Sequence, residues 1–353
     1  MTMTAAAGFA KISAALGTSF NDMGSVKRAC GSFREVYAEL RRSVGEVIVG
    51  QDTIVEQALI ALFADGHLLL EGVPGLGKTL LVSTLGRVLS LPYARIQFTP
   101  DIMPADITGT SIVIDDQKTG KRTFEFRPGP IFHQLVLADE INRATPKSQA
   151  ALLEAMQERS VTTAGQTHSL VRPFFVMATQ NPVEQEGTYP LPEAQLDRFL
   201  FKIVVPYTDR QELNTILERT TRNREVSLDP VLDGASIMHA QRLARRIIVA
   251  PQVQDYIIRM VLSTHPTGPY IPEDLKSLIR VGVSPRGAQS LISAGKVKAL
   301  IDGRYAIAIR DVHEIARAAL RHRIVRTFEA EAENITPDDI IEKLIRHVPR
   351  EAD

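Results

Sequence analysis

The chain has 353 residues, which is too long for one ordinary domain and suits a large domain followed by a smaller one. Its 41 basic residues balance 41 acidic ones, and zero net charge disfavours a protein that grips many nucleic-acid phosphates. The single cysteine, Cys30, excludes an internal disulfide and a cysteine-based zinc site. It fits the reducing cytoplasm, where we expect the protein to act.

Residues 1–31 are rich in Ala, Gly, Ser and Thr. Lys11, Ser13 and Asn21 interrupt any apolar run, so we expect a flexible tail rather than a signal peptide. A short amphipathic arm that docks on a partner is the alternative. No apolar run approaches the roughly 20 residues that a spanning helix needs, so no membrane span is expected.

An α/β domain is expected over residues 32–207. Ser32 and Glu35 have capping-box spacing before apolar residues at helical intervals, and Asp52 is expected to cap a helix that continues through Ala64. Short apolar runs suited to buried parallel strands follow at 67–71, 93–98, 134–138, 174–179 and 199–205. Helices are expected at 78–90 and 146–158, the second with a proline in its first turn.

Two β-hairpins interrupt this alternation. Residues 110–114 and 123–126 are β-branched, aromatic or alternating, and they flank turn chemistry at 115–121. Residues 161–163 and 169–171 flank a second expected turn at 164–167.

After a linker at about 206–209, residues 208–353 are expected to form a helical lid. Ser284 and Pro285 provide an N-cap and a first-turn proline for a helix to about Ile301. Asp311 and Thr336 are expected to start two further helices. The predicted architecture is a doubly wound parallel α/β domain with a C-terminal all-α domain.

The segment GVPGLGKT, from Gly72 to Thr79, matches G-x-x-x-x-G-K-[ST] at every position and lies between an apolar strand and a helix. The glycines let main-chain N–H groups face phosphate oxygens, and the helix N-terminus adds partial positive charge. Lys78 is expected to reach the β and γ phosphates of ATP, and the Thr79 hydroxyl to ligate Mg²⁺. A glycine turn without a ligand is the alternative. The expected nucleotide contacts here are Gly72, Val73, Pro74, Gly75, Leu76, Gly77, Lys78, Thr79 and Leu80.

The apolar strand at 135–138 ends in Asp139 and Glu140. In P-loop proteins the strand-terminal Asp organises the Mg²⁺ shell, and an adjacent Glu can polarise the attacking water. Two carboxylates at the end of a buried strand are otherwise costly. The alternative is a strand that ends at the surface with solvated acids.

Several longer stretches accompany these motifs. They are VGQ at 49–51, QFTPD at 97–101, GPIF at 129–132, ADEINRA at 138–144, ATQNP at 178–182, EGTYPLPEAQLDRF at 186–199, SPR at 284–286 and LRHR at 320–323. Over roughly residues 33–346 the chain therefore resembles an AAA+ ATPase of the MoxR family.

The resemblance implies roles for further residues. Asn181 matches sensor 1, which helps to position the attacking water, and Val49 and Gly50 match the segment that lines the adenine. Arg198 matches the arginine finger, which reaches the ATP of the neighbouring subunit, and Arg286 matches sensor 2, which touches the γ-phosphate from the lid. Cations placed there lower the barrier to phosphoryl transfer. The alternatives are an interdomain salt bridge for Arg198 and a solvated surface position for Arg286.

The two hairpins match family inserts that usually face a ring's pore or a partner. Asn142 and Arg143, beside the acidic pair, are expected to orient Glu140 or to contact the next subunit. The histidines show no metal-ligand spacing, so Mg²⁺ is the only metal expected.

The leading functional hypothesis is a ring-forming, usually hexameric, ATPase that remodels, matures or activates protein partners, commonly together with a von Willebrand factor A-domain protein. A nucleic-acid motor is the first alternative, which zero net charge disfavours. A nucleotide-dependent scaffold is the second, which intact Glu140 and Arg198 disfavour. A small-molecule kinase also uses a phosphate loop, but the helical lid and the two hairpins fit a ring ATPase better.

Overall fold

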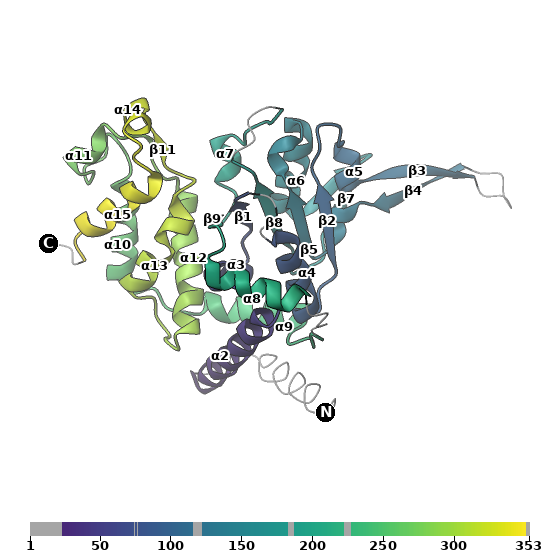
Figure 1. Ribbon diagram of the computed structural model, residues 1–353, viewed down its shortest axis with the longest axis horizontal. Coiled ribbons are helices and arrows are strands. Elements are labelled where there is room, and N and C mark those ends of the chain that lie inside the picture. Colours follow the sequence, from purple (N-terminus) through teal and green to yellow (C-terminus); the bar gives the residue numbers. More distant parts are fainter. Residues whose placement is uncertain are drawn as a thin grey trace.

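The computed structural model describes residues 23–73, 75, 77–115, 122–182, 187–221 and 227–350. An α/β domain and a helical domain lie beside each other, and one long hairpin projects from the α/β domain on the side away from the helical domain (Figure 1).

The α/β domain is built on a parallel sheet whose strands lie in the order β2-β5-β8-β1-β9. These strands are β1 (Leu68–Glu71), β2 (Tyr93–Gln97), β5 (Leu135–Asp139), β8 (Phe175–Gln180) and β9 (Phe201–Val204). The expected runs are confirmed, with ends that differ by a few residues. Since every strand points the same way, all their carboxyl ends meet at one edge of the sheet.

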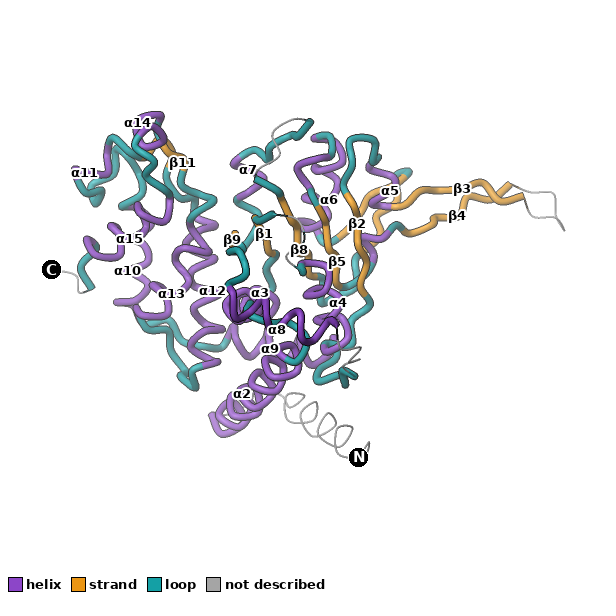
Figure 2. The backbone as a smooth tube through the Cα atoms, viewed as in Figure 1, coloured by secondary structure: helices purple, strands orange, loops and turns teal. Residues whose placement is uncertain are grey.

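Helices cover both faces of this sheet (Figure 2). In β1, Leu68 and Leu70 pack into a core shared with the lid, whereas Leu69 packs into a second core on the opposite face. The helices of the domain are α2 (Met23–Gly45), α3 (Asp52–Phe63), α4 (Lys78–Val88), α5 (Pro104–Thr108), η1 (Pro130–Phe132), η2 (Ile141–Arg143), α6 (Pro146–Glu158) and α7 (Glu193–Leu196). Burial on both faces is the doubly wound arrangement that the apolar strands predict.

The helical domain follows β9. Its elements are α8 (Arg210–Thr221), α9 (Gly234–Arg245), α10 (Pro251–Leu262), α11 (Glu273–Lys276), β10 (Ile279–Val281), α12 (Pro285–Ile301), α13 (Ile309–Leu320), β11 (Val325–Arg326), α14 (Phe328–Ala332) and α15 (Pro337–His347). The expected caps at Ser284 and Thr336 are present. The domain is not wholly helical, because β10 and β11 form a short antiparallel pair. Asp311 lies inside the first turn of α13, which ends at Leu320.

The N-terminal expectation is wrong for residues 23–31. They form the first turns of α2, and Ala29 and Cys30 are 0% and 1% exposed. Ser32 and Glu35 therefore lie inside a helix and do not cap one. Apolar spacing from Val26 through Phe33 continues the helical period upstream, which the glycine- and alanine-rich composition obscures. Residues 1–22 lie outside the described part of the chain.

Both hairpins are present. Strands β3 (Gly109–Asp115) and β4 (Arg122–Pro128) form the projecting one, whose expected turn lies largely outside the described residues. Strands β6 (Ser160–Thr163) and β7 (Gln166–Ser169) form the other. Their turn is tighter than expected, because Ala164 and Gly165 both adopt positive φ, as in a two-residue type I′ turn.

Stacked rings join the two hairpins at their bases. Phe126 of β4 lies parallel to His168 of β7 with centroids 3.9 Å apart, and Phe132 of η1 packs edge-on against Phe126 at 5.5 Å. The two inserts therefore share one small aromatic cluster.

Phe33→Ala should lower the free energy of unfolding by about 3–5 kcal/mol, because it leaves a cavity in a buried cluster. Phe33 is 1% exposed, and its ring lies 5.0 Å from that of Phe63. Urea denaturation measures this loss. Lys27→Ala, on the exposed face of the same helix, is the matched control and should change stability by less than about 0.5 kcal/mol. Equal stabilities for the two variants would contradict the docking of α2 in the core.

Candidate nucleotide-binding site

The phosphate loop connects β1 to α4. Gly75 and Gly77 have φ of 85° and 72°, a left-handed conformation that side chains rarely adopt, and a Cβ at either position would meet nothing within 4 Å. Gly72 differs, since its Cβ would lie 2.9 Å from the Cβ of Val205. Gly72 thus allows the residue after β9 to pack against the phosphate loop. Gly75 and Gly77 give the loop its turn on the side that no other described residue covers. Pro74 and Leu76 lie outside the described residues.

Lys78 starts α4 and points back over the loop. Its Nζ donates to the carbonyl of Gly72 at 2.8 Å. Burial lowers the pKa of Lys78, and the negative charges of Asp139 and Glu140 oppose that shift. The lysine therefore lies within electrostatic reach of the acidic pair. Thr79 and Leu80, which follow it, are exposed on the same helix turn.

Asp139 is the last residue of β5, and Glu140 follows it with φ of 57°. The Thr179 hydroxyl of β8 donates to Asp139 Oδ1 at 2.6 Å and accepts the N–H of Glu140 at 2.8 Å. One hydroxyl therefore fixes both acids. The guanidinium of Arg95 on β2 lies 2.7 Å from the other Asp139 oxygen, Oδ2.

Glu140 is held from two sides. Gln97 Nε2 donates to Glu140 Oε2 at 2.8 Å, and Arg143 Nε lies 3.2 Å from the same oxygen. Arg143 thus contacts Glu140, which agrees with the expectation that it orients this side chain. Arg95, Gln97 and Thr179 were not anticipated from the sequence. Arg95 and Gln97 are two positions apart in β2, so their side chains lie on the same face of the strand. This spacing of polar residues at a strand end is the sequence pattern that could have predicted their role.

Asn181 follows β8 at the same edge. It is 6% exposed, and its carbonyl accepts from Asn142 Nδ2 at 3.3 Å. The N–H of Gly72 donates to the carbonyl of Gln180 at 3.2 Å, so the end of β8 lies beside the phosphate loop. Lys78, Asp139, Glu140 and Asn181 are therefore brought together at the carboxyl edge of the sheet.

The segment of Val49 and Gly50 lies against α8. Gly50 has φ of 73°, and a Cβ on it would lie 2.2 Å from Glu212 Cδ. Arg219 Nη1 of the same helix donates to the carbonyls of Gly45 and Glu46 at 3.1 and 2.9 Å. Their contact with adenine stays a prediction.

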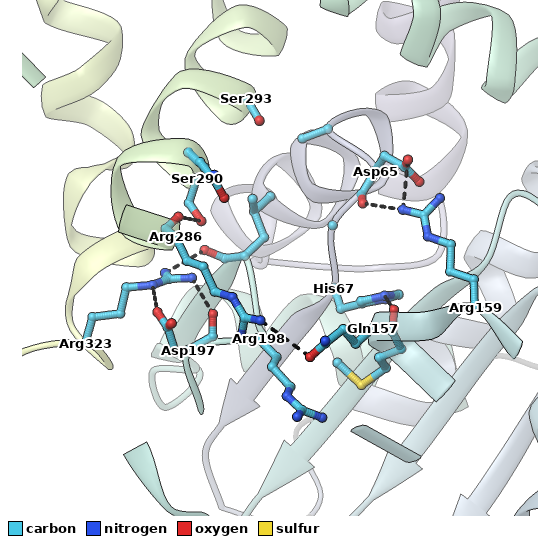
Figure 3. A pocket seen from close by; sticks show the side chains of 15 residues that line it. Asp65, His67, Gln157, Arg159, Asp197, Arg198, Arg286, Ser290, Ser293 and Arg323 are labelled. Carbon is cyan, nitrogen blue, oxygen red and sulfur yellow. Dashed lines mark hydrogen bonds and ion pairs between the residues drawn. The ribbon is translucent and has the colours of Figure 1, made fainter. Parts of the chain in front are cut away.

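Arg198 and Arg286 lie elsewhere. Both line a cavity of about 290 Å³ that also contains His67 and Leu200, the residues directly before β1 and β9 (Figure 3). This is the amino edge of the sheet, and β1 separates it from the phosphate loop by roughly 13 Å at about 3.3 Å per residue. The structure therefore does not bring Arg198 or Arg286 to the phosphate loop of their own chain.

The cavity has excess positive charge. Its two acids are already paired, Asp65 with Arg159 at 2.8 Å and Asp197 with Arg323 at 2.8 Å. Among the described residues no carboxylate lies within 4 Å of the Arg198 or Arg286 guanidinium. Within the described part of the chain, Arg198 Nε is buried without a hydrogen-bond partner, and the one side-chain hydrogen bond of Arg286 joins Nη2 to Gln157 Oε1 at 3.4 Å. Since buried donors are nearly always satisfied, this arrangement fits an anion.

His67 is a buried histidine in the wall of the same cavity. Its Nδ1 accepts the N–H of Val176 at 3.1 Å, and Nε2 faces the carbonyl of Met156 at 3.3 Å, which defines a neutral ring protonated on Nε2. Burial lowers the pKa of His67 to about 4.

Acidification should destabilise the protein through His67. Its pKa is about 4 when folded and about 6.5 when unfolded. Between these values the unfolded chain binds more protons, so the free energy of unfolding falls as the pH falls, by about 3 kcal/mol over the full window. Urea denaturation between pH 7 and 4.5 measures the slope. His67→Gln, which cannot titrate, should flatten it, and an unchanged slope would contradict the assignment.

The comparisons with known proteins agree with this geometry. Residues 67–201 match the family described as ATPase family associated with various cellular activities (AAA), and residues 273–344 match the AAA lid domain. Fold and site together define an AAA+ ATPase domain with its lid.

The chain is 43% identical to Chaperone MoxR1 of Mycobacterium tuberculosis, over 88% of this chain and 81% of that protein. It is also 43% identical to YeaC of Bacillus subtilis, over 86% and 92% of the two chains. The crystal structure of a candidate ATPase from Cytophaga hutchinsonii superposes with a TM-score of 0.84 at 40% identity, covering 91% of this chain and 96% of the other. The chain belongs to the MoxR family. In the described part of the molecule, no helix combines the length and apolar character required to cross a bilayer.

Proposed function

We propose that the protein hydrolyses MgATP at sites shared between neighbouring copies of the chain in a ring, and uses turnover to remodel, mature or activate partner proteins. The observation that carries the proposal is the separation of the two cationic residues from the phosphate loop. Lys78 and the acidic pair lie at one edge of the sheet, whereas Arg198 and Arg286 line a cavity at the other.

The residues at the carboxyl edge bind the nucleotide and prepare the water. Lys78 neutralises the β and γ phosphates, and the loop amides surround them. The Thr79 hydroxyl and the Asp139 carboxylate are hard oxygen donors of the kind that Mg²⁺ prefers, and they would hold the ion. When bound, this ion neutralises charge on the phosphates. Glu140 accepts the proton of the attacking water, and Asn181 orients that water.

The residues at the amino edge serve the nucleotide of the next copy. A head-to-tail contact places the amino edge of one chain over the carboxyl edge of its neighbour, and repetition of such a contact closes a ring. Arg198 and Arg286 then approach the γ-phosphate together, where added cations stabilise charge on the equatorial oxygens. The sensor 2 role of Arg286 is therefore proposed in trans, beside Arg198, rather than on its own nucleotide.

The partner-remodelling role rests on family membership and on the projecting hairpin. One of the relatives is named a chaperone. Phe124 and Val113 on β4 and β3 are 78% and 52% exposed, which offers an apolar contact surface to a protein client. A hexameric ring, a von Willebrand factor A-domain partner and a cytoplasmic location complete the proposal.

Mixing variants tests the shared site. Arg198→Ala and Arg286→Ala should each lower kcat strongly, on the order of 10³-fold for an arginine supplied in trans. Binding of a fluorescent ATP analogue should be retained, because the phosphate loop is untouched. Lys78→Ala should abolish nucleotide binding. Arg198→Ala and Lys78→Ala should each be nearly inactive alone, but their mixture should regain activity where an intact phosphate loop faces intact arginines.

Arg245→Ala is the matched control, since this exposed arginine pairs with Asp65, which keeps Arg159 as a partner. It should hydrolyse ATP like the parent. Absence of rescue in the mixture, with both variants folded and assembled, would refute sites shared between copies.

Glu140→Gln separates a motor from a scaffold. This variant should bind ATP and assemble but fail to activate a client, because turnover is needed. Client activation is measured beside that of the parent. Full activation by Glu140→Gln would show that ATP only orders the assembly.

A further inference from the structure

Arg323 is a buried cation of the same cavity to which the proposed function gives no role. It follows α13, and its side chain is 2% exposed. A guanidinium has five N–H donors in a fixed planar fork. All are used, in hydrogen bonds to Asp197 Oδ1 and to the carbonyls of Asp197, Phe199, Leu200 and Ala319.

Most of these acceptors belong to the segment that carries Arg198. Arg323 Nε donates to Asp197 Oδ1 at 2.8 Å, and Nη2 donates to the Asp197 and Phe199 carbonyls at 3.0 and 2.7 Å. The main chain on both sides of Arg198 is therefore held by one side chain from the lid. His322 Nε2 adds a contact to the Phe199 carbonyl at 3.1 Å.

The same carboxylate reaches the segment that carries Arg286. The Ser284 hydroxyl lies 2.9 Å from each Asp197 carboxylate oxygen, to which it donates, and it accepts the N–H of Arg286 at 3.1 Å as the N-cap of α12. Gly287, in the first turn of α12, packs closely on Val283 and Arg323, because a Cβ there would lie 2.1 Å from Val283 Cγ1 and 3.1 Å from Arg323 Cδ.

We propose that the buried Arg323–Asp197 pair, extended by Ser284, is the positioning element that fixes Arg198 and Arg286 relative to each other, so that the α/β domain and the lid present both to the neighbour's nucleotide as one unit. This inference rests on the proposed shared site. Arg323 also lines the cavity, but its donors are all occupied, so it acts through Arg198 and Arg286 rather than on the nucleotide (Figure 3).

The chemistry of the pair explains why an arginine is required. Burial lowers the pKa of Arg323, and the hydrogen bond with Asp197 opposes that shift, so the buried charge is compensated by its partner. The three N–H donors of lysine are all on one nitrogen atom. A lysine therefore cannot hydrogen-bond to Asp197 and to carbonyl groups on several sides at the same time. Arg323→Lys therefore keeps the charge but loosens the segment around Arg198.

Arg323→Lys should lower kcat about 10- to 100-fold, since a displacement of about 1 Å in a catalytic group can cost about 10²-fold. KM for ATP should stay within about twofold of the parent, because the phosphate loop of the same chain is untouched. Steady-state hydrolysis at a fixed protein concentration, with assembly checked by size-exclusion chromatography, gives both constants.

Arg321→Lys is the matched control. Arg321 lies two residues earlier and pairs with Asp338 within the lid at 2.7 Å, without contact to residues 197–200. Its kcat should match that of the parent. An equal loss in Arg321→Lys and Arg323→Lys would show a general effect on the lid and overturn the positioning role.

Subunit mixing separates this inference from the proposed function. Arg323→Lys mixed with Lys78→Ala should regain activity, as Arg198→Ala mixed with Lys78→Ala does. If only the Arg198→Ala mixture is rescued, the shared site stands and the positioning role of Arg323 falls. If neither mixture is rescued, the shared site itself fails.

Ser284→Ala covers the case in which Arg323→Lys does not fold. It leaves the Arg323–Asp197 pair intact and removes the Ser284 hydrogen bonds to Asp197 and to the Arg286 N–H, so it should also lower kcat with KM retained and be rescued by Lys78→Ala. Parental kcat in folded Ser284→Ala would overturn the link between the two arginines.

Discussion

The common direction of the strands in the central sheet determines where each functional group of this chain lies. Because β1, β5 and β8 run parallel, the phosphate loop, the acidic pair and Asn181, which follow these strands, all lie at one edge of the sheet. The same polarity places whatever precedes β1 and β9 at the opposite edge. A chain folded this way separates its phosphate loop from Arg198 and Arg286 by the length of a strand, and the proposed sharing of sites between copies rests on that separation.

Side chains from neighbouring strands complete the carboxyl edge. Thr179 joins β8 to both acids of β5, and Arg95 and Gln97 reach them from β2 on the other side. The acids are thus held by groups on both flanking strands, and the order β2-β5-β8 is as much part of the site as the motif itself. At the amino edge Arg323 has the corresponding role, since it ties the lid to the segment of Arg198.

The sequence predicts the residues that belong to short motifs and misses those whose contacts depend on which strands are neighbours in the sheet. Gly72–Thr79 and the acids after β5 were found because a short pattern and its flanking strand specify them. Thr179 and Arg95 were missed because their partners lie 40 and 44 residues away and are defined only by strand order. The start of α2 was missed because composition was weighed above apolar spacing. For Arg286 the motif gave a role but not the side of the molecule, which only the packing of α12 against Asp197 supplies.

The stacked Phe126 and His168 rings have a mechanical consequence for the projecting hairpin. Strand β4 is held there near its base, and the four residue steps from Phe126 to Arg122 extend about 14 Å at about 3.4 Å each. A tilt of about 5° at this aromatic contact would therefore displace the Arg122 end of the strand by roughly 1 Å. Because His168 of the second hairpin forms part of the same contact, and β6 follows α6 after Arg159, a shift of α6 would reach the described part of β4 through these rings.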